Sequence, residues 1–369
     1  MKNKTLILLA LFGLIYVTSC KKDKDDSDTT KSLLPSKMTV DIPEALNYPE
    51  QGKKATATDS ITPIKGNDIY RNLRTFINVG AGGAKIVNDI IYAVAKNNIT
   101  KIQEATFTGE DGKTKYLKVY LSPKTDSITW QYGLTIKDFD NSNAFQLFWN
   151  QKPIKGIAIF HIAKFDHNNL FGKLHPYGMI RIDYSEDQTN YDKQMIVSIA
   201  NLKTYTINDI NNMKMFVGKK GNNLDIYGNS NHPTALLIDS KHQGGFNWAF
   251  VAHADDNLNI GVAEVALPVC NYDKLNNLLT DFSIKKVLAE EINNVYGGVL
   301  SQQELDSLSN IILKNAEAPG YFIGKDGFVS CGSNIPSNSG FSQAFIDLSA
   351  LNPYIPKNIN DLEIKFYNY

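Results

Sequence analysis

The stretch that decides the fold class is MKMFVGKKGNNLDIY, residues 213–227. Its two ends, 213–218 and 223–227, are strand candidates, and in the second of them polar and apolar residues alternate from Asn223 to Ile226. Between them, Gly218–Asn222 is rich in glycine and asparagine, which favour turns because they tolerate positive φ. The stretch therefore predicts an antiparallel β-hairpin.

A period of two, in which side chains alternate between apolar and polar, recurs from about residue 102 to residue 268. Tyr116, Lys118 and Tyr120, for example, alternate with Leu117 and Val119. Further strand candidates are 127–136, 144–150, 156–163, 178–184, 194–200, 246–253 and 260–267. The connections are short, whereas parallel strands need crossovers of about a dozen residues or more. This region therefore predicts an antiparallel meander.

Helical periodicity flanks the sheet region on both sides. Residues 67–97 have apolar side chains three or four apart, and Gly80–Gly83 is expected to break or kink the path. Helical spacing returns after residue 272, with a capping box at Ser301–Glu304, and a final strand is expected near 362–367. We predict an α+β domain over 63–369: a large curved antiparallel sheet, in one form a half-barrel, with segregated N- and C-terminal helices.

The N-terminus has the parts of an export signal. Lys2 and Lys4 precede the apolar run Leu6–Val17, which is too short to span a bilayer core of about 30 Å. The segment Val17–Cys20 resembles the lipobox of bacterial lipoproteins. This resemblance implies that residues 1–19 are a signal peptide and that Cys20 carries the lipid anchor.

The residues after Cys20 resemble the charged tether of surface-exposed Bacteroidetes lipoproteins. The resemblance implies a flexible tether over 20–62, although Asp41–Pro43 could dock on the domain. Because Lys21 rather than aspartate follows the cysteine, it also implies the outer membrane, with the domain facing the cell surface. The body resembles uncharacterised envelope lipoproteins of these bacteria, which implies no activity.

The charge balance excludes a nucleic-acid partner. Lys plus Arg and Asp plus Glu both number 38, so no overall field attracts a polyanion. With 43% hydrophobic and 21% charged residues, the composition is that of an ordinary globular protein. The expected membrane contact is therefore the lipid on Cys20.

Two cysteines remain beyond Cys20. In an exported protein, Cys270 and Cys331 are expected to form a disulfide, the alternative being two buried free thiols. Neither has a second cysteine or a histidine at metal-ligand spacing.

Weak metal candidates occur in two places, and we expect no cofactor at either. The first set has histidine and carboxylate ligands but no recognised spacing: His161, Asp166, His167 and His175. The second set lies where a strand meets a turn: His253, Asp255 and Asp256. Calcium-type oxygen ligands alternate at Asp138, Asp140, Ser142 and Asn143, but the glycine and glutamate of a calcium loop are missing, which favours a polar hairpin.

No catalytic motif stands out, and we assign no catalytic residue. Gly80–Lys85 lacks the third glycine of a dinucleotide-binding loop, and no Gly-x-Ser-x-Gly is present. Aromatic residues in the predicted strands could stack on sugar rings or line an apolar pocket, the alternative being core packing.

We expect an outer-membrane-anchored envelope lipoprotein that is a noncatalytic binding protein for a lipid, glycan or protein partner. The alternatives are a secreted-type hydrolase acting on an extracellular polymer and an accessory subunit of an envelope complex.

Overall fold

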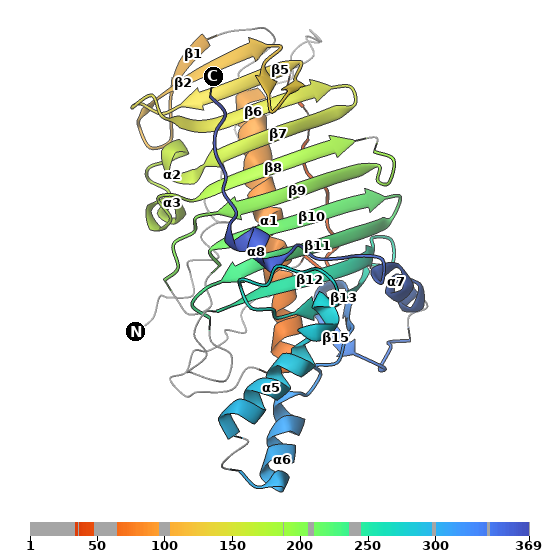
Figure 1. The fold of residues 1–369 in the computed structure, drawn as a ribbon. Helices are drawn as coiled ribbons and strands as arrows, with labels where there is room; N and C mark the ends of the chain where they lie inside the picture. Colours follow the sequence, from red (N-terminus) through yellow and green to blue (C-terminus); the bar gives the residue numbers. More distant parts are fainter. Residues whose placement is uncertain are drawn as a thin grey trace. The chain divides into compact units, whose positions relative to one another are not determined.

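The fold is α+β, and its sheet is an unclosed antiparallel meander (Figure 1). The computed structural model describes residues 34–35, 37–47, 65–95, 104–186, 188–205, 210–235, 245–296, 300–337 and 340–368. Thirteen strands follow one another in chain order from β1 to β15, and β3 and β4 form a separate two-stranded sheet. The predicted fold class is confirmed. The predicted signal peptide and Cys20 lie outside the described residues.

The strands are β1 (Glu104–Thr108), β2 (Thr114–Leu121), β3 (Lys124–Thr125), β4 (Ile128–Thr129), β5 (Tyr132–Lys137), β6 (Asn143–Gln151), β7 (Ile154–His161), β8 (Met179–Glu186), β9 (Lys193–Ala200), β10 (Asn212–Lys220), β11 (Asn223–His232), β12 (Phe246–Asp255), β13 (Ile260–Ala266), β14 (Gly320–Ile323) and β15 (Gly327–Cys331). The helices are α1 (Gly66–Ala95), α2 (Ile162–Phe165), α3 (Leu170–Leu174), α4 (Leu278–Asp281), α5 (Ile284–Tyr296), α6 (Gln302–Ile312), α7 (Gly340–Leu348) and α8 (Pro356–Asn360), with a 3₁₀ turn, η1, at Gly324–Asp326.

The hairpin predicted from residues 213–227 is formed by β10 and β11. Lys220 pairs with Asn223, and the turn between them places Gly221 at a φ of 59°. Strand β11 continues beyond the prediction to His232, because β12 pairs with it along its whole length.

Helix α1 is unbroken, so the predicted interruption at Gly80–Gly83 is wrong. A Cβ on Gly80 would lie 2.6 Å from Cε of Met215, a β10 residue. The glycine therefore permits close helix-to-sheet packing instead of ending the helix.

Two other expectations differ from the structure. Residues 362–368 are not a strand, and the late strands are instead β14 and β15. The short helices α2 and α3 also interrupt the meander between β7 and β8. Residues 362–368 form no strand pairing; backbone groups of Tyr367 bind instead to the Gln146 side chain of the sheet, as described below.

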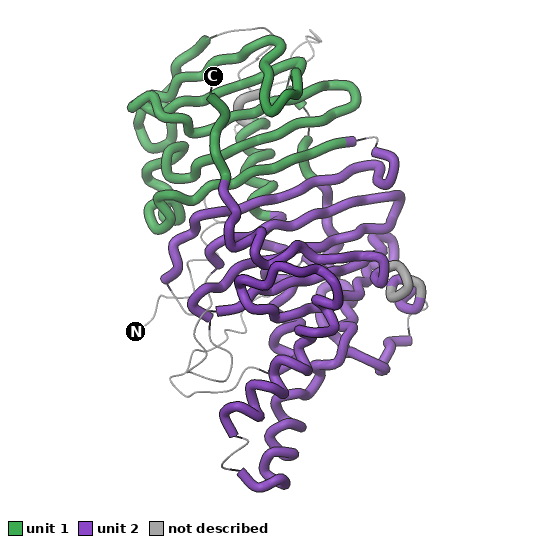
Figure 2. Tube along the Cα trace, viewed as in Figure 1, with its two compact units in different colours: residues 1–39, 82–185, 364–369 green, residues 40–81, 186–363 purple. Residues whose placement is uncertain are grey.

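The chain divides into two compact units (Figure 2). Unit 1 comprises residues 1–39, 82–185 and 364–369, and unit 2 comprises residues 40–81 and 186–363. The domain boundaries expected from the sequence stay predictions.

Residues 37–47, which fall in the predicted tether, are packed against the units to which they belong. In unit 1, Met38 is 1% exposed, and its backbone N–H donates to Asn88 Oδ1. In unit 2, Leu46 is fully buried, and the backbone N–H of Ala45 donates to Asn259 Oδ1. This part of the range is therefore not a free tether.

Unit 2 buries both faces of its strands. On one face, Phe76 of α1 packs edge-on against Trp248 of β12, with ring centroids 4.0 Å apart. On the other face, an apolar cluster joins Val251 of β12 and Val262 of β13 to Phe341 of α7. When a strand is covered on both faces, nearly all of its residues are buried, as they are in β12.

Buried carboxamide side chains hold the C-terminal segment on the sheet of unit 2. Asn229 Nδ2 donates to the carbonyl of Tyr354 over 3.1 Å, and Asn212 Nδ2 donates to the carbonyl of Ile359 over 2.9 Å. Asn247 Nδ2 donates to Asn229 Oδ1 over 2.8 Å. Side chains of the sheet thus donate hydrogen bonds to backbone carbonyls of the C-terminal segment, which has no strand partner for them.

A similar arrangement occurs in unit 1. Gln146 of β6 donates through Nε2 to the carbonyl of Tyr367 and accepts through Oε1 from the backbone N–H of Tyr367, both at 2.8 Å. Residues 364–368 accordingly run across the strands of this unit (Figure 1).

Asn229→Ala is expected to lower the free energy of unfolding by about 1–3 kcal/mol, because it removes the side-chain donor of the buried Tyr354 carbonyl and the nearer of two acceptors of the Asn247 amide. Urea unfolding of the purified protein measures this change. Asn223→Ala, at the exposed end of the same strand, is the matched control and should change stability by less than about 0.5 kcal/mol. Equal effects of the two substitutions would contradict the anchoring role.

Candidate functional site

A cluster of charged side chains in unit 1 is the candidate site. Asp111 lies in the turn between β1 and β2, and Lys115 lies at the start of β2. Asp138 directly follows β5, and His167 lies between α2 and α3. The β2–β5 register pairs Tyr116 with Lys137 and so brings Lys115 beside Asp138.

Lys115 is the centre of this cluster. Its Nζ lies 2.9 Å from Asp111 Oδ2 and 2.8 Å from Asp138 Oδ1, and it also donates to the carbonyl of Lys164 over 3.0 Å. The Lys115 side chain is 1% exposed, and those of both aspartates are 0% exposed. The ammonium group therefore has three acceptors and is fully satisfied.

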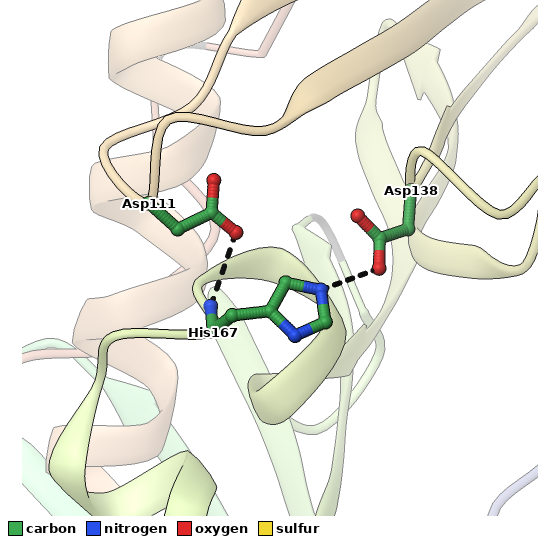
Figure 3. Close-up of side chains that lie close together, drawn as sticks. All are labelled: Asp111, Asp138 and His167. Atoms are coloured by element: carbon green, nitrogen blue, oxygen red, sulfur yellow. Dashed lines mark hydrogen bonds and ion pairs between the residues drawn. The ribbon is translucent and has the colours of Figure 1, made fainter.

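His167 completes the cluster at its exposed side. Its ring Nε2 lies 2.6 Å from Asp138 Oδ2, and its backbone N–H donates to Asp111 Oδ2 over 3.1 Å (Figure 3). The side chain is 33% exposed, and Nδ1 has no hydrogen-bond partner among the residues that the structure describes. The carboxylate of Asp138 thus orients an imidazole whose second nitrogen is unengaged.

Asp111, Asp138 and His167 also satisfy the simplest requirement for a metal site, since their ligand atoms all lie within 4.8 Å of one another. Carboxylate and imidazole ligands suit zinc and similar ions. However, Lys115 already bonds to both carboxylates, so a metal ion would have to displace a buried ammonium group. The arrangement fits an internal ion-pair cluster better than a metal centre.

The four weak metal candidates are not gathered at one point. His167 belongs to the cluster, whereas Asp166 Oδ1 accepts from the backbone N–H of Asn168. The ring of His175 packs against Phe171 with centroids 4.3 Å apart. His161 keeps a buried Nδ1 without a partner, and burial lowers the pKa of its ring.

The aspartates of residues 138–143, the segment with calcium-type ligands, pair with two different lysines. Asp138 binds Lys115, whereas Asp140 binds Lys164 at 2.7 Å and accepts from the backbone N–H of Ser142. These side chains stabilise the turn between β5 and β6, in agreement with the polar-hairpin alternative.

Sequence reasoning missed Asp111 and Lys115. The available signal was the inward position of Lys115, which shares a strand face with the buried Leu117 and Val119. A charge at such a position requires a partner of opposite charge.

The electrostatics keep both aspartates ionised. Burial raises the pKa of Asp138, but hydrogen bonds from Lys115 and His167 outweigh it and hold the pKa below the ordinary value. For Asp111, burial is likewise outweighed by the hydrogen bond from Lys115 and by backbone N–H groups. Neither carboxyl group has the raised pKa of a general acid.

A second polar chain lies in unit 2. Asp225 Oδ1 lies 2.8 Å from His253 Nδ1, and Asp225 Oδ2 accepts from the Tyr191 hydroxyl over 2.8 Å. The other two residues predicted with His253 belong to separate contacts: Asp255 accepts from the backbone N–H of Leu258, and Asp256 pairs with Lys219. No sequence motif marks Asp225, because the β11–β12 register alone places it beside His253.

The disulfide expected between Cys270 and Cys331 is not formed, and both residues are buried free thiols. Cys331 pairs with Gly320, which pairs in turn with Ala263. Cys270 comes seven residues after Ala263, beyond the end of β13. Strand pairing therefore does not place Cys331 opposite Cys270.

The comparisons with known proteins give no relative. No family model matches the chain, and no curated protein or solved structure does so either. Among the described helices, none combines the length and the apolar character needed to cross a membrane.

Lys115→Met is expected to lower the free energy of unfolding by about 3–5 kcal/mol, because it leaves two buried carboxylates without their cation. Lys164→Met is the matched control: it removes a half-exposed pair and should cost about 1 kcal/mol or less. Urea unfolding at pH 7 measures both.

The pH dependence has a defined sign. Because the folded-state pKa values of Asp111 and Asp138 are lowered, the two groups stabilise the fold above their unfolded pKa of about 3.9. This stabilisation is lost as the pH falls through the folded-state values. Without Lys115, burial raises both pKa values, so the midpoint of acid unfolding should move to higher pH. The same midpoint in Lys115→Met and Lys164→Met would contradict this.

Proposed function

We propose that the protein is a lipid-anchored envelope lipoprotein that binds a lipid, glycan or protein partner without catalysing a reaction. The observation that carries the proposal is the lipobox-like segment ending at Cys20, followed by a folded domain. Acyl chains on a cysteine anchor a protein through about 0.8 kcal/mol per buried CH₂ group. The place proposed for the anchor is the outer membrane, with the domain facing the cell surface.

The chemistry of the charged cluster supports a binding role. Lys115 neutralises Asp111 and Asp138, and both carboxyl groups have lowered pKa values. The cluster therefore lacks a carboxyl group that is ready to donate a proton near neutral pH. It instead joins the β1–β2 turn, the end of β5 and the α2–α3 segment.

Cys20→Ala is expected to release the protein from the membrane fraction, because no acyl chain can then be attached. The measurement is fractionation of the native host with mass spectrometry of the N-terminal peptide. Protease treatment of intact cells then distinguishes surface display from periplasmic display. A membrane-bound Cys20→Ala protein, together with wild type that carries no acyl chain, would contradict the anchor.

One observation favours the second candidate, a hydrolase acting on an extracellular polymer. His167 is oriented by Asp138 and has an unengaged Nδ1, which is the arrangement of a general base. In this alternative, Nδ1 would take the proton of an attacking water molecule.

His167→Gln distinguishes the two candidates. For a binding protein, we expect no release of reducing ends or new amino termini from polysaccharide and protein polymers, with wild type and variant alike. The hydrolase would be the correct candidate if the wild type and the control Tyr177→Phe cleave a polymer and a folded His167→Gln protein does not. That result would overturn the binding proposal.

A further inference from the structure

Within unit 2, side-chain amides of the sheet bind the backbone of the C-terminal segment. Asn229 Nδ2 donates to the carbonyl of Tyr354 over 3.1 Å, and Asn212 Nδ2 donates to the carbonyl of Ile359 over 2.9 Å. No residue from 351 to 360 belongs to a strand. Because these hydrogen bonds go to backbone carbonyls, they recognise a polypeptide chain and not particular side chains.

Four asparagines form this surface, which we call the carboxamide face. Asn212 of β10 pairs with Asn231 of β11, which pairs in turn with Asn247 of β12. Directly paired residues project from the same side of a sheet, and Asn229, two residues before Asn231, projects from that side as well. All four side chains are buried. Buried amides are costly unless each polar atom has a hydrogen-bond partner.

Unit 1 contains a complete contact between a carboxamide and a backbone. Gln146 donates through Nε2 to the carbonyl of Tyr367 and accepts through Oε1 from the N–H of the same residue, both over 2.8 Å. One amide group thus satisfies both backbone groups of one residue. Such a pair requires a backbone N–H, which proline does not have.

The corresponding contact in unit 2 is only half made. Asn247 Nδ2 donates to the carbonyl of Pro356 over 3.5 Å, but Asn247 Oδ1 is buried and has no hydrogen-bond partner among the described residues. Pro356 has no N–H, so it cannot complete the pair as Tyr367 does. Asn231 Oδ1 is a second buried acceptor that no described residue satisfies. The carboxamide face therefore has acceptors that the C-terminal segment leaves unused.

The orientation of the Asn247 amide is set by its neighbour. Asn229 turns its NH₂ group to the Tyr354 carbonyl, so its oxygen faces Asn247 and accepts from Nδ2 over 2.8 Å. Exchanging the nitrogen and oxygen of Asn247 would place two oxygens against each other. The unused oxygen thus belongs to the arrangement of the site.

We propose that the carboxamide face binds a polypeptide segment of a partner protein in place of residues 351–360, an inference that rests on the binding role proposed above and names its partner class. A segment with a residue other than proline opposite Asn247 supplies the missing N–H. A polypeptide presents the N–H and C=O groups that carboxamides match, whereas an acyl chain presents neither. Since residues 351–360 form no strand ladder, their exchange for the partner leaves the sheet pairing intact.

The test uses the full-length protein in detergent and two synthetic peptides of residues 349–363. One peptide carries Pro356→Ala, and the other carries N-methylalanine at this position, which lacks the N–H. Hydrogen exchange at Lys357 reports release of the attached segment, because its N–H donates to the Tyr272 carbonyl. Titration extends to millimolar peptide, since the attached segment competes at high effective concentration.

Both peptides are expected to speed exchange at Lys357, the alanine peptide at about fivefold lower concentration, which is the effect of one net hydrogen bond. Pro356→Ala in the full-length chain supplies the N–H to Asn247 in cis. Both peptides should then need about fivefold higher concentrations than with the wild type.

Asn247→Ala removes the acceptor, so the two peptides should act at the same concentration on this variant. Asn223→Ala, at the exposed end of β11, is the matched control and should keep the fivefold preference. The urea midpoint of each variant shows whether it folds. If Asn247→Ala is unfolded, the full-length Pro356→Ala protein decides, because it retains all four asparagines of the carboxamide face.

Three outcomes overturn the inference: neither peptide speeds exchange at Lys357, both act on the wild type at the same concentration, or the full-length Pro356→Ala protein responds as the wild type does. Each of these leaves the binding role in place for a lipid or a glycan. Catalytic turnover that depends on His167 would instead overturn the binding role itself, so the two failures are distinguishable.

Discussion

The hydrogen bonds from sheet carboxamides to the C-terminal backbone are the interaction on which the covered face of each unit depends. Residues 349–368 contain little regular structure beyond α8, so most of their peptide groups need partners outside a helix or strand. Asn212 and Asn229 in unit 2 and Gln146 in unit 1 provide such partners. Buried asparagines in strands, otherwise unfavourable, are explained by this role. The same anchoring holds the ring of Tyr354 against that of Tyr227, with centroids 5.4 Å apart.

In the charged cluster of unit 1, buried polar side chains likewise form hydrogen bonds and ion pairs with one another. Lys115 is enclosed by carboxylates, and Asp138 in turn orients His167. Such a cluster fixes how turns meet at the ends of strands, and it leaves Nδ1 of His167 without a partner among the described residues.

Much of the sheet could be predicted from the sequence, because a period of two together with short turns determines antiparallel neighbours locally. The hairpin at 213–227 is the clearest case. Gly80 was misjudged because its role depends on Met215, which is distant in sequence. Asp225 and Lys115 were missed for the same reason: strand register supplies their partners, and residue type alone does not. Cys20 and the predicted signal peptide lie outside the described residues, and the proposed anchor rests on the sequence.

Hydrogen exchange of the C-terminal segment tests the anchoring most directly. The backbone N–H of Tyr367 donates to Gln146, and that of Lys357 donates to the carbonyl of Tyr272. Both amides should exchange roughly a hundredfold or more slower than in an unstructured peptide of the same sequence, although neither belongs to a strand. Exchange of the Tyr367 amide at the unstructured rate would show that the Gln146 carboxamide does not hold this segment, and the description of the covered face of unit 1 would be wrong.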